Sequence, residues 1–585
     1  MFGRSFGVFA AAAVLMLSAI SLGATYGGGS GTAEDPYQIW TAEQMNTIGA
    51  NSADWDKHFK LMDDIDMSAY TGVQYNIIGN ETISFTGTFD GNGHTISNFT
   101  YETDEPIYYV GLFGFTDKGM AIVTSINDAM IKNLGVENVY INIVGQNGPK
   151  RVGGLVGFNA GTITSCYTTG YVNSSSNSIE NHVGGLVGKH HAGKISECYS
   201  TCSVTGDMHI GGLVGYNDYG LINNCYTNAT VRGRNRVGGL IGFSFHGAFF
   251  SCYTEGKVSG IDSNSENIGG LIGGTNSSRM NFCSSRGEVD GTNDCRYLGG
   301  LIGHMTATII SSCYVTGPVI GGRDIGGLVG RTNYSDIITS SYVSGSVSGI
   351  NAGALVGENN TGITIYPPLA ISSCFWDIPA TGKSNSIGIG PNAGGTGKTT
   401  EEMKMRSTFV DSGWDFTDIW AICEGTNYPR LKMQIPAADW VCPDGVGTED
   451  LDYFAHRWLM SECGISNEWC NRTDSDESRL VDLADFSVFA EQWLQVYTVF
   501  TSPKNLVAWW QLNEMGGYLL SVADSIGGHH GKVVNIGKGQ FPWVAGRFNN
   551  ALTLDGVDDY VDVGGYAGIT GTASRTCTAW IKTTA

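Results

Sequence analysis

The chain has 585 residues, a formal net charge of −22, 84 glycines and only 15% charged residues. This length exceeds what one ordinary hydrophobic core holds together, so several domains are expected. The glycine-rich, charge-poor composition favours a turn-rich β protein and argues against long amphipathic helices. Because an acidic chain repels phosphate backbones, the charge also argues against a nucleic acid partner.

An export signal is predicted at the N-terminus. Arg4 precedes an apolar run at residues 6–20 that is shorter than a comfortable membrane span, and small residues follow this run. We therefore expect a signal peptide at residues 1–24, with a single membrane anchor as the alternative. No other segment of the sequence predicts a span, so after signal cleavage the protein is expected to be secreted or at the cell surface.

Residues 26–115 are predicted to form an N-terminal cap and the first coils of a repeat domain. Thr41 and Gln44 have the spacing of a capping box, which predicts a short helix near residues 41–50. The sequence Asp-Gly-Asn-Gly at residues 90–93 is a turn signal between two strand-like runs.

A repeat fills residues 116–376 and predicts a parallel β-solenoid. The motif GGL[VI]G occurs at residues 153–157, 184–188, 211–215, 238–242, 269–273, 299–303 and 326–330. A second phrase, such as SCYTTGYV, follows each copy at a similar distance, and related copies stand at 110–114 and 353–357. A period of about 27–31 residues is typical of a solenoid in which each repeat forms one coil.

Stacking explains why the repeat must be long. The few apolar side chains of one coil cannot offset the conformational entropy of ordering it, so a single coil should not fold alone. The paired glycines suit close backbone approach between coils. Ile163 and Cys166 are three residues apart, so both point inward only if the chain bends between them.

These coils resemble GLUG repeats, which are found in secreted adhesin-like proteins and beside IgA-specific metalloprotease domains. The resemblance covers roughly residues 110–376 and rests on the two phrases recurring in order. It implies a secreted protein of the adhesin type. Since metalloproteases accompany such repeats, we searched for zinc ligands, but none of the eleven histidines begins an HExxH sequence.

Six of the fourteen cysteines occupy one position of the repeat: Cys166, Cys198, Cys225, Cys252, Cys283 and Cys313, with Ser341 in the same place. An exported chain favours disulfides. Stacked coils lie about 4.8 Å apart, however, and parallel side chains at that spacing hold the Cβ atoms beyond the usual limit of about 4.5 Å for a bridge. A buried ladder of free thiols is therefore favoured over disulfides.

Two further segments suggest catalysis without supporting it. Asp63, Asp64 and Asp66 are carboxylates of the kind used by lyases and hydrolases, but a solvated turn near the cap is the favoured interpretation. The sequence GPNAGGTGKTT at residues 390–400 suggests a P-loop, which would require glycine where Asn392 stands. We expect a glycine-rich loop that closes the solenoid.

Residues 377–436 are therefore predicted to be a C-terminal cap and linker, and their tail resembles the segment that ends GLUG arrays. Beyond it, VGTEDLDYFAHRWL and VDLADFSVFAEQWL align with a spacing of 35 residues. This duplication within residues 437–496 resembles a type I dockerin, which implies a cohesin-like partner. The resemblance also implies calcium, held in an EF-hand-like loop by Asp474, Asp476, Ser478, the Leu480 carbonyl, Asp482 and Asp485.

The dockerin-like module departs from the EF-hand pattern. Arg479 occupies the sixth position of the second loop, where glycine is usual. The first loop keeps only Asp439 and Asp450, with Val441, Pro443 and Gly447 at the other ligand positions. The alternative is a metal-free helical hairpin held by aromatic side chains (Phe454, Trp458, Phe489 and Trp493) and a disulfide among Cys442, Cys463 and Cys470.

Residues 503–585 resemble the first half of a laminin-G-like or concanavalin-A-like β-sandwich, a fold that often binds glycans. A half-sandwich would expose its apolar inner face, so we expect an incomplete domain.

The sequence as a whole predicts a mainly β protein: a β-solenoid, a small α-helical EF-hand-like pair and a partial antiparallel β-sandwich. The favoured function is a secreted, non-catalytic binding or adhesion protein directed to a polysaccharide, cell-surface glycan or matrix. The alternatives are an extracellular polysaccharide-degrading enzyme, either a lyase or a glycoside hydrolase, and a component of a cohesin–dockerin assembly. An enzyme would need carboxylates or Lys and Arg side chains clustered on one face of adjacent coils, where we expect Ser, Thr, Asn and Gly instead.

Overall fold

The computed structural model describes most of the chain up to residue 493 and five short strands beyond it. The described residues are 26–117, 129–145, 150–175, 178, 180–291, 294–360, 366–436, 438–442, 445–463, 468–475, 478–493, 521–522, 531–534, 543–545, 550–552 and 560–562. The expected signal peptide at 1–24 lies outside them, as does most of the expected sandwich at 503–585. The chain divides into two units, Met1–Gln492 and Trp493–Ala585.

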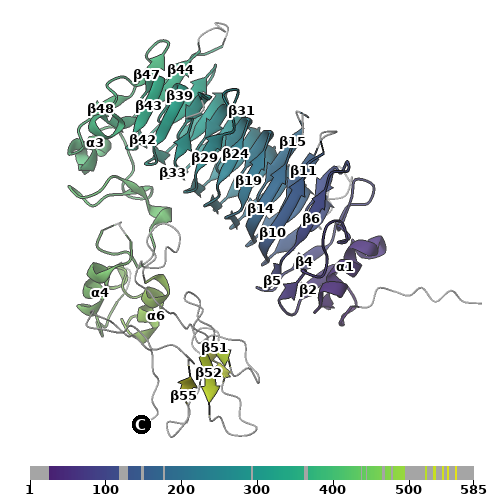
Figure 1. The fold of residues 1–585 in the computed structure, drawn as a ribbon. Helices are drawn as coiled ribbons and strands as arrows, with labels where there is room; N and C mark the ends of the chain where they lie inside the picture. The colour runs from purple at the N-terminus through teal and green to yellow at the C-terminus, as the bar shows by residue number, and fades with distance from the viewer. Residues whose placement is uncertain are drawn as a thin grey trace, which may run out of the picture. The chain divides into compact units, whose positions relative to one another are not determined.

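Residues 37–398 form a parallel β-solenoid with three long sheets (Figure 1). Copies of the motif pair in register from coil to coil, so that Val156 pairs with Val187 and Val187 with Val214. Hydrogen bonds between neighbouring coils thereby satisfy the backbone, and the apolar side chains fill a continuous core between the sheets. The predicted mainly β fold with a parallel solenoid is confirmed.

The strands are short and repeat down the solenoid. Sheet 1 contains β1 (Tyr37–Ile39), β2 (His58–Leu61), β4 (Thr88–Asp90), β9 (Met130–Lys132), β13 (Thr162–Thr164), β17 (Lys194–Ser196), β22 (Leu221–Asn223), β27 (Ala248–Phe250), β32 (Arg279–Asn281), β37 (Ile309–Ser311), β41 (Ile337–Thr339) and β45 (Ala370–Ser372). Sheet 3 contains β8 (Phe113–Thr116), β12 (Val156–Asn159), β16 (Val187–His191), β21 (Val214–Asp218), β26 (Ile241–Phe245), β31 (Ile272–Asn276), β36 (Ile302–Thr306), β40 (Val329–Thr332), β44 (Val356–Asn359) and β47 (Ile387–Ile389).

Sheet 2 is the widest of the three. It contains β3 (Ile65–Asp66), β5 (Thr95–Ser97), β6 (Thr100–Thr103), β7 (Tyr109–Val110), β10 (Gly135–Ile143), β11 (Lys150–Gly153), β14 (Tyr167–Ser174), β15 (Asn181–Gly184), β18 (Tyr199–Ser200), β19 (Ser203–Gly206), β20 (Met208–Gly211), β23 (Tyr226–Thr227), β24 (Val231–Gly233), β25 (Asn235–Gly238), β28 (Tyr253–Thr254), β29 (Val258–Gly260), β30 (Glu266–Gly269), β33 (Ser284–Ser285), β34 (Val289–Asp290), β35 (Arg296–Gly299), β38 (Tyr314–Val315), β39 (Val319–Gly326), β42 (Tyr342–Val343), β43 (Val347–Gly353), β46 (Phe375–Asp377) and β48 (Thr396–Lys398).

Each coil turns its corners at residues in the left-handed backbone conformation. Ser165, between the buried Ile163 and Cys166, has φ 52°. Because this conformation reverses the alternation of side chains, both neighbours point into the core, as their spacing requires. The same corner recurs at Glu197, Asn224, Ser251, Phe282, Ser312, Ser340 and Ser373.

The paired glycines of the motif let the coils stack closely. A Cβ on Gly212 would lie 2.1 Å from the carbonyl oxygen of Gly239 in the next coil. Since a Cβ atom does not tolerate that contact, Gly212 is required for reasons of space, whereas the copy near the end of the array has Ala354 at this position.

Nine free cysteines are found among the described residues, and all are buried. They include the six ladder positions predicted from the repeat, and Cys374 extends the ladder by one coil. The structure therefore holds the ladder as thiols. Cys463 pairs with Cys470, as one of the expected combinations allowed, while Cys442 pairs with Cys423, outside the expected set.

Helical elements lie at the ends of the solenoid and in the module that follows. They are α1 (Ala42–Ala50), the 3₁₀ helix η1 (Ser52–Asp54), α2 (Ile378–Thr381), η2 (Glu402–Lys404), α3 (Arg406–Val410), η3 (Lys432–Gln434), α4 (Thr448–Ala455), α5 (Glu468–Asn471) and α6 (Leu483–Gln492). Helix α1 confirms the helix predicted near residues 41–50, because Thr41 accepts a hydrogen bond from the Gln44 amide and caps it.

The C-terminal cap covers part of a ladder of stacked tyrosines on sheet 2. Tyr167, Tyr199, Tyr226 and Tyr253 stack with ring centres 4.8–5.0 Å apart. Further along, Tyr314 and Tyr342 are buried under residues 403–434, which include the antiparallel pair β49 (Trp420–Ala421) and β50 (Arg430–Leu431). The Tyr342 hydroxyl donates to the Pro429 carbonyl at 2.7 Å. The glycine-rich segment at 390–400 was expected to be a loop; residues 390–395 connect β47 to β48, and β48 itself pairs with β46 at the end of the solenoid.

The second unit contains two small antiparallel sheets. One consists of β51 (Ser521–Val522), β52 (Gly531–Val534) and β55 (Tyr560–Asp562), and the other of β53 (Trp543–Ala545) and β54 (Asn550–Leu552). No helix among the described residues is long and apolar enough to cross a membrane.

Candidate functional site

The edge where sheet 3 meets sheet 2 carries the most varied side chains of the solenoid, and we call it the motif edge. Two columns of residues form it, one following each GGL[VI]G motif and one preceding it by two positions. The first column is Phe115, Phe158, Lys189, Tyr216, Phe243, Gly274, His304, Arg331 and Glu358. The second is Tyr109, Arg151, His182, His209, Arg236, Asn267, Tyr297, Asp324 and Asn351.

Cations and aromatic rings interleave along the first part of this edge, residues 109–243, which we call the aromatic–cationic half. The Lys189 ammonium lies 5.1 Å from the centre of the Tyr216 ring. The Arg236 guanidinium lies 4.2 Å from that of Phe243, and the Arg151 guanidinium 5.4 Å from that of Tyr109. Contacts of this kind hold the long side chains along the edge and leave them half-buried.

Two buried histidines support these side chains from below. His182 stacks on Tyr216 at 4.7 Å, and His209 packs against both Tyr216 and Phe243. Burial, with the nearby charge of Arg236 and Lys189, lowers the pKa of His209 to about 3. Both histidines are therefore neutral near pH 7, because burial also lowers the pKa of His182 well below its usual value.

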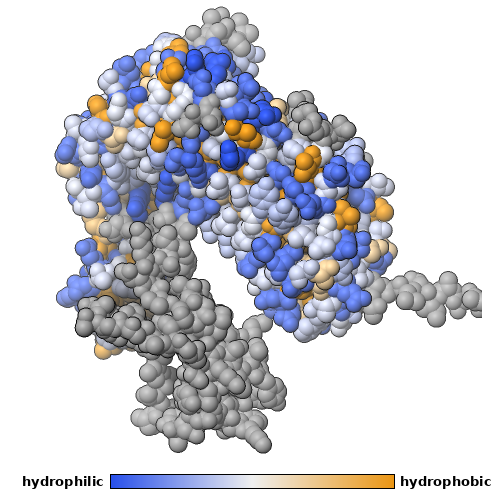
Figure 2. Space-filling view, in the orientation of Figure 1, coloured by the Kyte–Doolittle hydropathy of each residue, from blue (hydrophilic) through white to orange (hydrophobic). Residues whose placement is uncertain are grey.

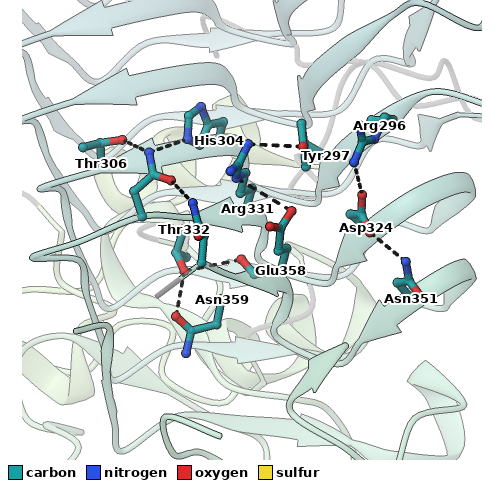
Figure 3. A network of polar contacts seen from close by, with 12 residues as sticks. Arg296, Tyr297, His304, Thr306, Asp324, Arg331, Thr332, Asn351, Glu358 and Asn359 are labelled. Carbon is teal, nitrogen blue, oxygen red and sulfur yellow. Dashed lines mark hydrogen bonds and ion pairs between the residues drawn. The ribbon is translucent and has the colours of Figure 1, made fainter. Parts of the chain in front are cut away.

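Ion pairs dominate the second part of the edge, shown in Figure 3, which we call the charged half. The Arg296 Nη2 atom lies 3.1 Å from Oδ2 of Asp324, and Asn351 donates to Asp324 Oδ1 at 2.9 Å. Arg331 donates to the Tyr297 hydroxyl at 3.1 Å, and its Nε lies 3.7 Å from Glu358. These contacts join side chains from three adjacent coils in two sets, one centred on Asp324 and one on Arg331.

A shallow groove of about 460 Å³ opens at the charged half. It is lined by Ser263, Asp294, Arg296, Arg323, Asp324, Asn351, Glu358 and Ile389. Asp294, Asp324 and Glu358 each lie beside an arginine. Each of these carboxylates is thus engaged by a neighbouring arginine, and the groove presents a set of paired charges to a polar ligand.

The repeat pattern of the sequence does not reveal this edge. We expected Ser, Thr, Asn and Gly on the outward positions, and that expectation is wrong for these two columns. They vary from coil to coil, so they do not register as part of the repeat. Reading the residue after each motif down the copies is the signal that would have found them.

The predicted calcium loop is a compact turn in which carboxylates accept backbone N–H groups. Asp474 is buried and accepts hydrogen bonds from the amides of Ser478 and Arg479, at 3.0 and 2.9 Å. Asp485 is buried and accepts from the amides of Ser475 and Asp482.

The remaining predicted ligands lie in the same loop. Asp482 accepts from the Ala484 amide at 2.7 Å, and the Leu480 carbonyl accepts from the Ser478 hydroxyl at 3.1 Å. Asp476 lies outside the described residues. Among the described residues of the chain, no group of three or more His, Cys, Asp or Glu side chains is placed so that it could hold a metal ion. The oxygen donors suit calcium by chemistry, while their described positions bond the loop's own backbone.

Arg479 takes the backbone conformation that the sixth position of such a loop requires. Its φ is 76°, in the left-handed region that glycine adopts at low cost. The turn therefore keeps its shape, but its backbone conformation at Arg479 is strained because the residue has a side chain. The first loop has the same pattern at its twelfth position, where Asp450 accepts the amides of Trp440, Val441 and Gly447.

The acidic run near the N-terminal cap was expected to be a turn; Asp63 and Asp64 lie in the bend before β3, whereas Asp66 is the last residue of that strand. Asp64 accepts the Thr95 amide at 2.8 Å and lies 3.3 Å from His94. Hydrogen bonds from Asn98 and Ser68 lower the pKa of Asp66. All three carboxylates are exposed, and the contacts of Asp64 and Asp66 hold neighbouring strands together.

The GLUG motif matches residues 206–232, which form one coil of the solenoid. This match supports a GLUG-repeat solenoid. Two curated proteins are similar to the chain. A "Putative Gly-rich membrane protein" of Evansella cellulosilytica is 33% identical over 70% of this chain and 46% of its own length. "Halomucin" of Haloquadratum walsbyi is 33% identical over 30% of this chain and 2% of its own length. The chain thus spans less than half of either relative.

Two solved structures give weak likenesses. A "putative immunoglobulin A1 protease from Bacteroides ovatus" is 20% identical, with a TM-score of 0.33 over 70% of this chain and 95% of that one. An "IgA1 Protease" is 12% identical, with a TM-score of 0.27 over 64% of this chain and 24% of that one. Likenesses of this size carry no argument about activity.

Proposed function

We propose that the protein is a secreted or surface-exposed, non-catalytic binding protein directed to glycans, with the motif edge of its GLUG solenoid as the binding surface. The observation that carries this proposal is the row of half-buried aromatic side chains at Phe158, Tyr216 and Phe243. Aromatic rings pack against the apolar faces of sugars, and the adjacent Lys and Arg side chains supply hydrogen-bond donors for hydroxyl groups.

The rest of the surface supports recognition by individual side chains. On the face drawn in Figure 2, hydrophobic residues of the solenoid form small separate patches among hydrophilic ones. A continuous apolar face would instead favour a protein partner. An extracellular or surface location fits relatives that are described as a membrane protein and as halomucin.

The parts that follow the solenoid have supporting roles in this proposal. The dockerin-like module acts as a calcium-dependent connector to a cohesin-like protein, through the loop at residues 474–485. The laminin-G-like region at 503–585 adds a second carbohydrate-binding surface.

A polysaccharide-acting enzyme is the second candidate, and the groove of the charged half favours it. There Asp294, Asp324 and Glu358 come together on adjacent coils, which is the arrangement that an enzyme on a β-solenoid needs. The arginine beside each carboxylate is the reason we rank this candidate second.

Glycan-array binding together with a reducing-sugar assay on plant and algal polysaccharides tests both candidates. We expect binding without release of reducing ends. Tyr216→Ala should weaken binding about tenfold, because one aromatic contact contributes roughly 0.5–1.5 kcal/mol. Tyr199→Ala is the matched control, since Tyr199 is also half-buried and stacked but belongs to the tyrosine ladder of sheet 2. Turnover of any polymer would establish the enzyme instead.

A further inference from the structure

One half-buried cation of the aromatic–cationic half has no carboxylate beside it. Arg236 stacks on the Phe243 ring, and its Nη1 lies 2.7 Å from Nε2 of His209. Among the described residues, no carboxylate oxygen lies within ion-pair distance of its guanidinium, whereas Arg151 pairs with Glu180 and Lys189 with Asp218. Burial of a charge without a counter-ion is costly, so a ligand that brings one is favoured at this position.

The groups that contact Arg236 directly are neutral, and the carboxylate of Glu266 acts on it from beyond ion-pair distance. His209, which accepts its hydrogen bond, is uncharged near pH 7 because its pKa is about 3. The positive charges of Arg151, Lys189 and Arg236 each lower the pKa of the buried His182, which lies one coil before His209. Because Arg151 and Lys189 each pair with a carboxylate, the attraction for an anion on this stretch centres on Arg236.

The contacts of Arg236 leave it able to bind an anion. A guanidinium has five N–H donors, and the hydrogen bond from Nη1 to His209 uses one of them. The remaining donors match the two oxygens of a carboxylate or sulfate group. Tyr216 lies on the coil of His209 and Phe243 on the coil of Arg236, so both aromatic rings are close to an anion bound by Arg236.

We propose that the aromatic–cationic half binds an acidic polysaccharide, with a carboxylate or sulfate group on Arg236 and the sugar ring against Tyr216 and Phe243. This inference rests on the proposed function, because it names the class of glycan that the motif edge recognises. An extended polymer suits this edge because the coils repeat at a regular spacing, so that successive sugars contact successive coils.

Titration calorimetry with the full chain tests the inference. The probes are polygalacturonate as a carboxylated polymer, heparin as a sulfated polymer, dextran as a neutral polymer and sodium sulfate as the anion alone. We expect at least one acidic polymer to bind at least tenfold more tightly than dextran and sulfate, with an affinity that falls as salt is raised. Arg236→Gln should reduce that affinity at least tenfold.

Arg234→Gln is the matched control, because Arg234 is exposed two residues away and already pairs with Asp207 and Asp262. It should bind like the wild type. Arg236→Lys keeps the charge and loses the two-pronged donor, so it should lie between the wild type and Arg236→Gln. Thermal melting of each variant verifies that it is folded, and Arg236→Lys replaces Arg236→Gln if the latter unfolds.

The outcomes separate this inference from the proposed function. If dextran or sodium sulfate binds as tightly as the acidic polymers, or if Arg236→Gln binds like Arg234→Gln, the inference is overturned and glycan binding at the edge stands. If no glycan of any class binds, including those on the array, both are overturned.

Discussion

Asp336 is a carboxyl group whose protonation is coupled to folding. It is fully buried at a corner of the solenoid and accepts hydrogen bonds from the amides of Thr308 and Asn333, at 2.9 and 3.0 Å. Burial nevertheless raises its pKa to about 7. The folded protein therefore holds a proton on Asp336 that the unfolded chain, with a pKa near 3.8, has already released.

This difference predicts how stability depends on pH. Since the folded state binds more protons between about pH 4 and pH 7, the free energy of unfolding should fall as the pH rises through that window and level off above it. One carboxyl contributes at most about 1.4 kcal/mol per pH unit. Urea unfolding of the wild type and Asp336→Asn across the window measures the effect, and the variant should show a flatter slope.

Asp63→Asn is the control for this experiment, because Asp63 lies in the exposed turn near the N-terminal cap. Its slope should match that of the wild type. A wild-type slope in Asp336→Asn would mean that Asp336 stays ionised while buried.

At the scale of the element, we expect the second loop of the dockerin-like module to couple calcium binding to folding. Its carboxylates, Asp474, Asp476, Asp482 and Asp485, crowd one short loop. Without a metal ion these negative charges repel one another, and backbone N–H groups offset only part of that cost at Asp474 and Asp485. Calcium that binds the folded loop alone stabilises it through mass action.

We therefore expect millimolar calcium to raise the helicity and melting temperature of a 437–496 fragment, measured by far-ultraviolet circular dichroism. A stabilisation of about 2.7 kcal/mol corresponds to calcium at a hundredfold excess over its dissociation constant. Asp474→Ala should abolish the calcium-dependent gain, whatever its effect on basal stability. Asp439→Ala, in the first loop, should leave the gain intact. An unmoved wild-type melting curve would leave only a structural hairpin, stabilised by the Cys463–Cys470 disulfide.

The whole molecule is stabilised by contacts between neighbouring coils. The thiols at Cys166, Cys198 and Cys225 are buried in consecutive coils, and each backbone strand pairs with its counterparts above and below. Because a coil has no core of its own, exposure of a central thiol requires neighbouring coils to open together.

Thiol titration with and without denaturant, in the absence of reductant, tests this arrangement. In native conditions the ladder thiols should react only as fast as the solenoid unfolds. In denaturant all six, Cys166, Cys198, Cys225, Cys252, Cys283 and Cys313, should react. Fewer than four reactive thiols in denaturant would mean that ladder cysteines are bridged.

The repeat sequence by itself determined the solenoid, its caps and the thiol ladder. These follow from local patterns: the glycine pairs that permit close stacking, the apolar residues that cannot be buried in one coil, and the Thr41 cap of α1. The bend at Ser165 was also implied, since Ile163 and Cys166 had to share the core. For the dockerin-like loop, the sequence named the oxygen donors, and their convergence on an ion stays a prediction.

Only the tertiary structure decided what the motif edge presents. Arg236, His209 and Phe243, like Arg296 and Asp324, stand on different coils or on different strands of one coil. They meet because the register of parallel strands places positions about 27 residues apart on adjacent rungs. The side chains in these columns change from coil to coil, so no repeating pattern marks them. Their contacts, burial and charge arise from stacking, which a linear sequence does not display.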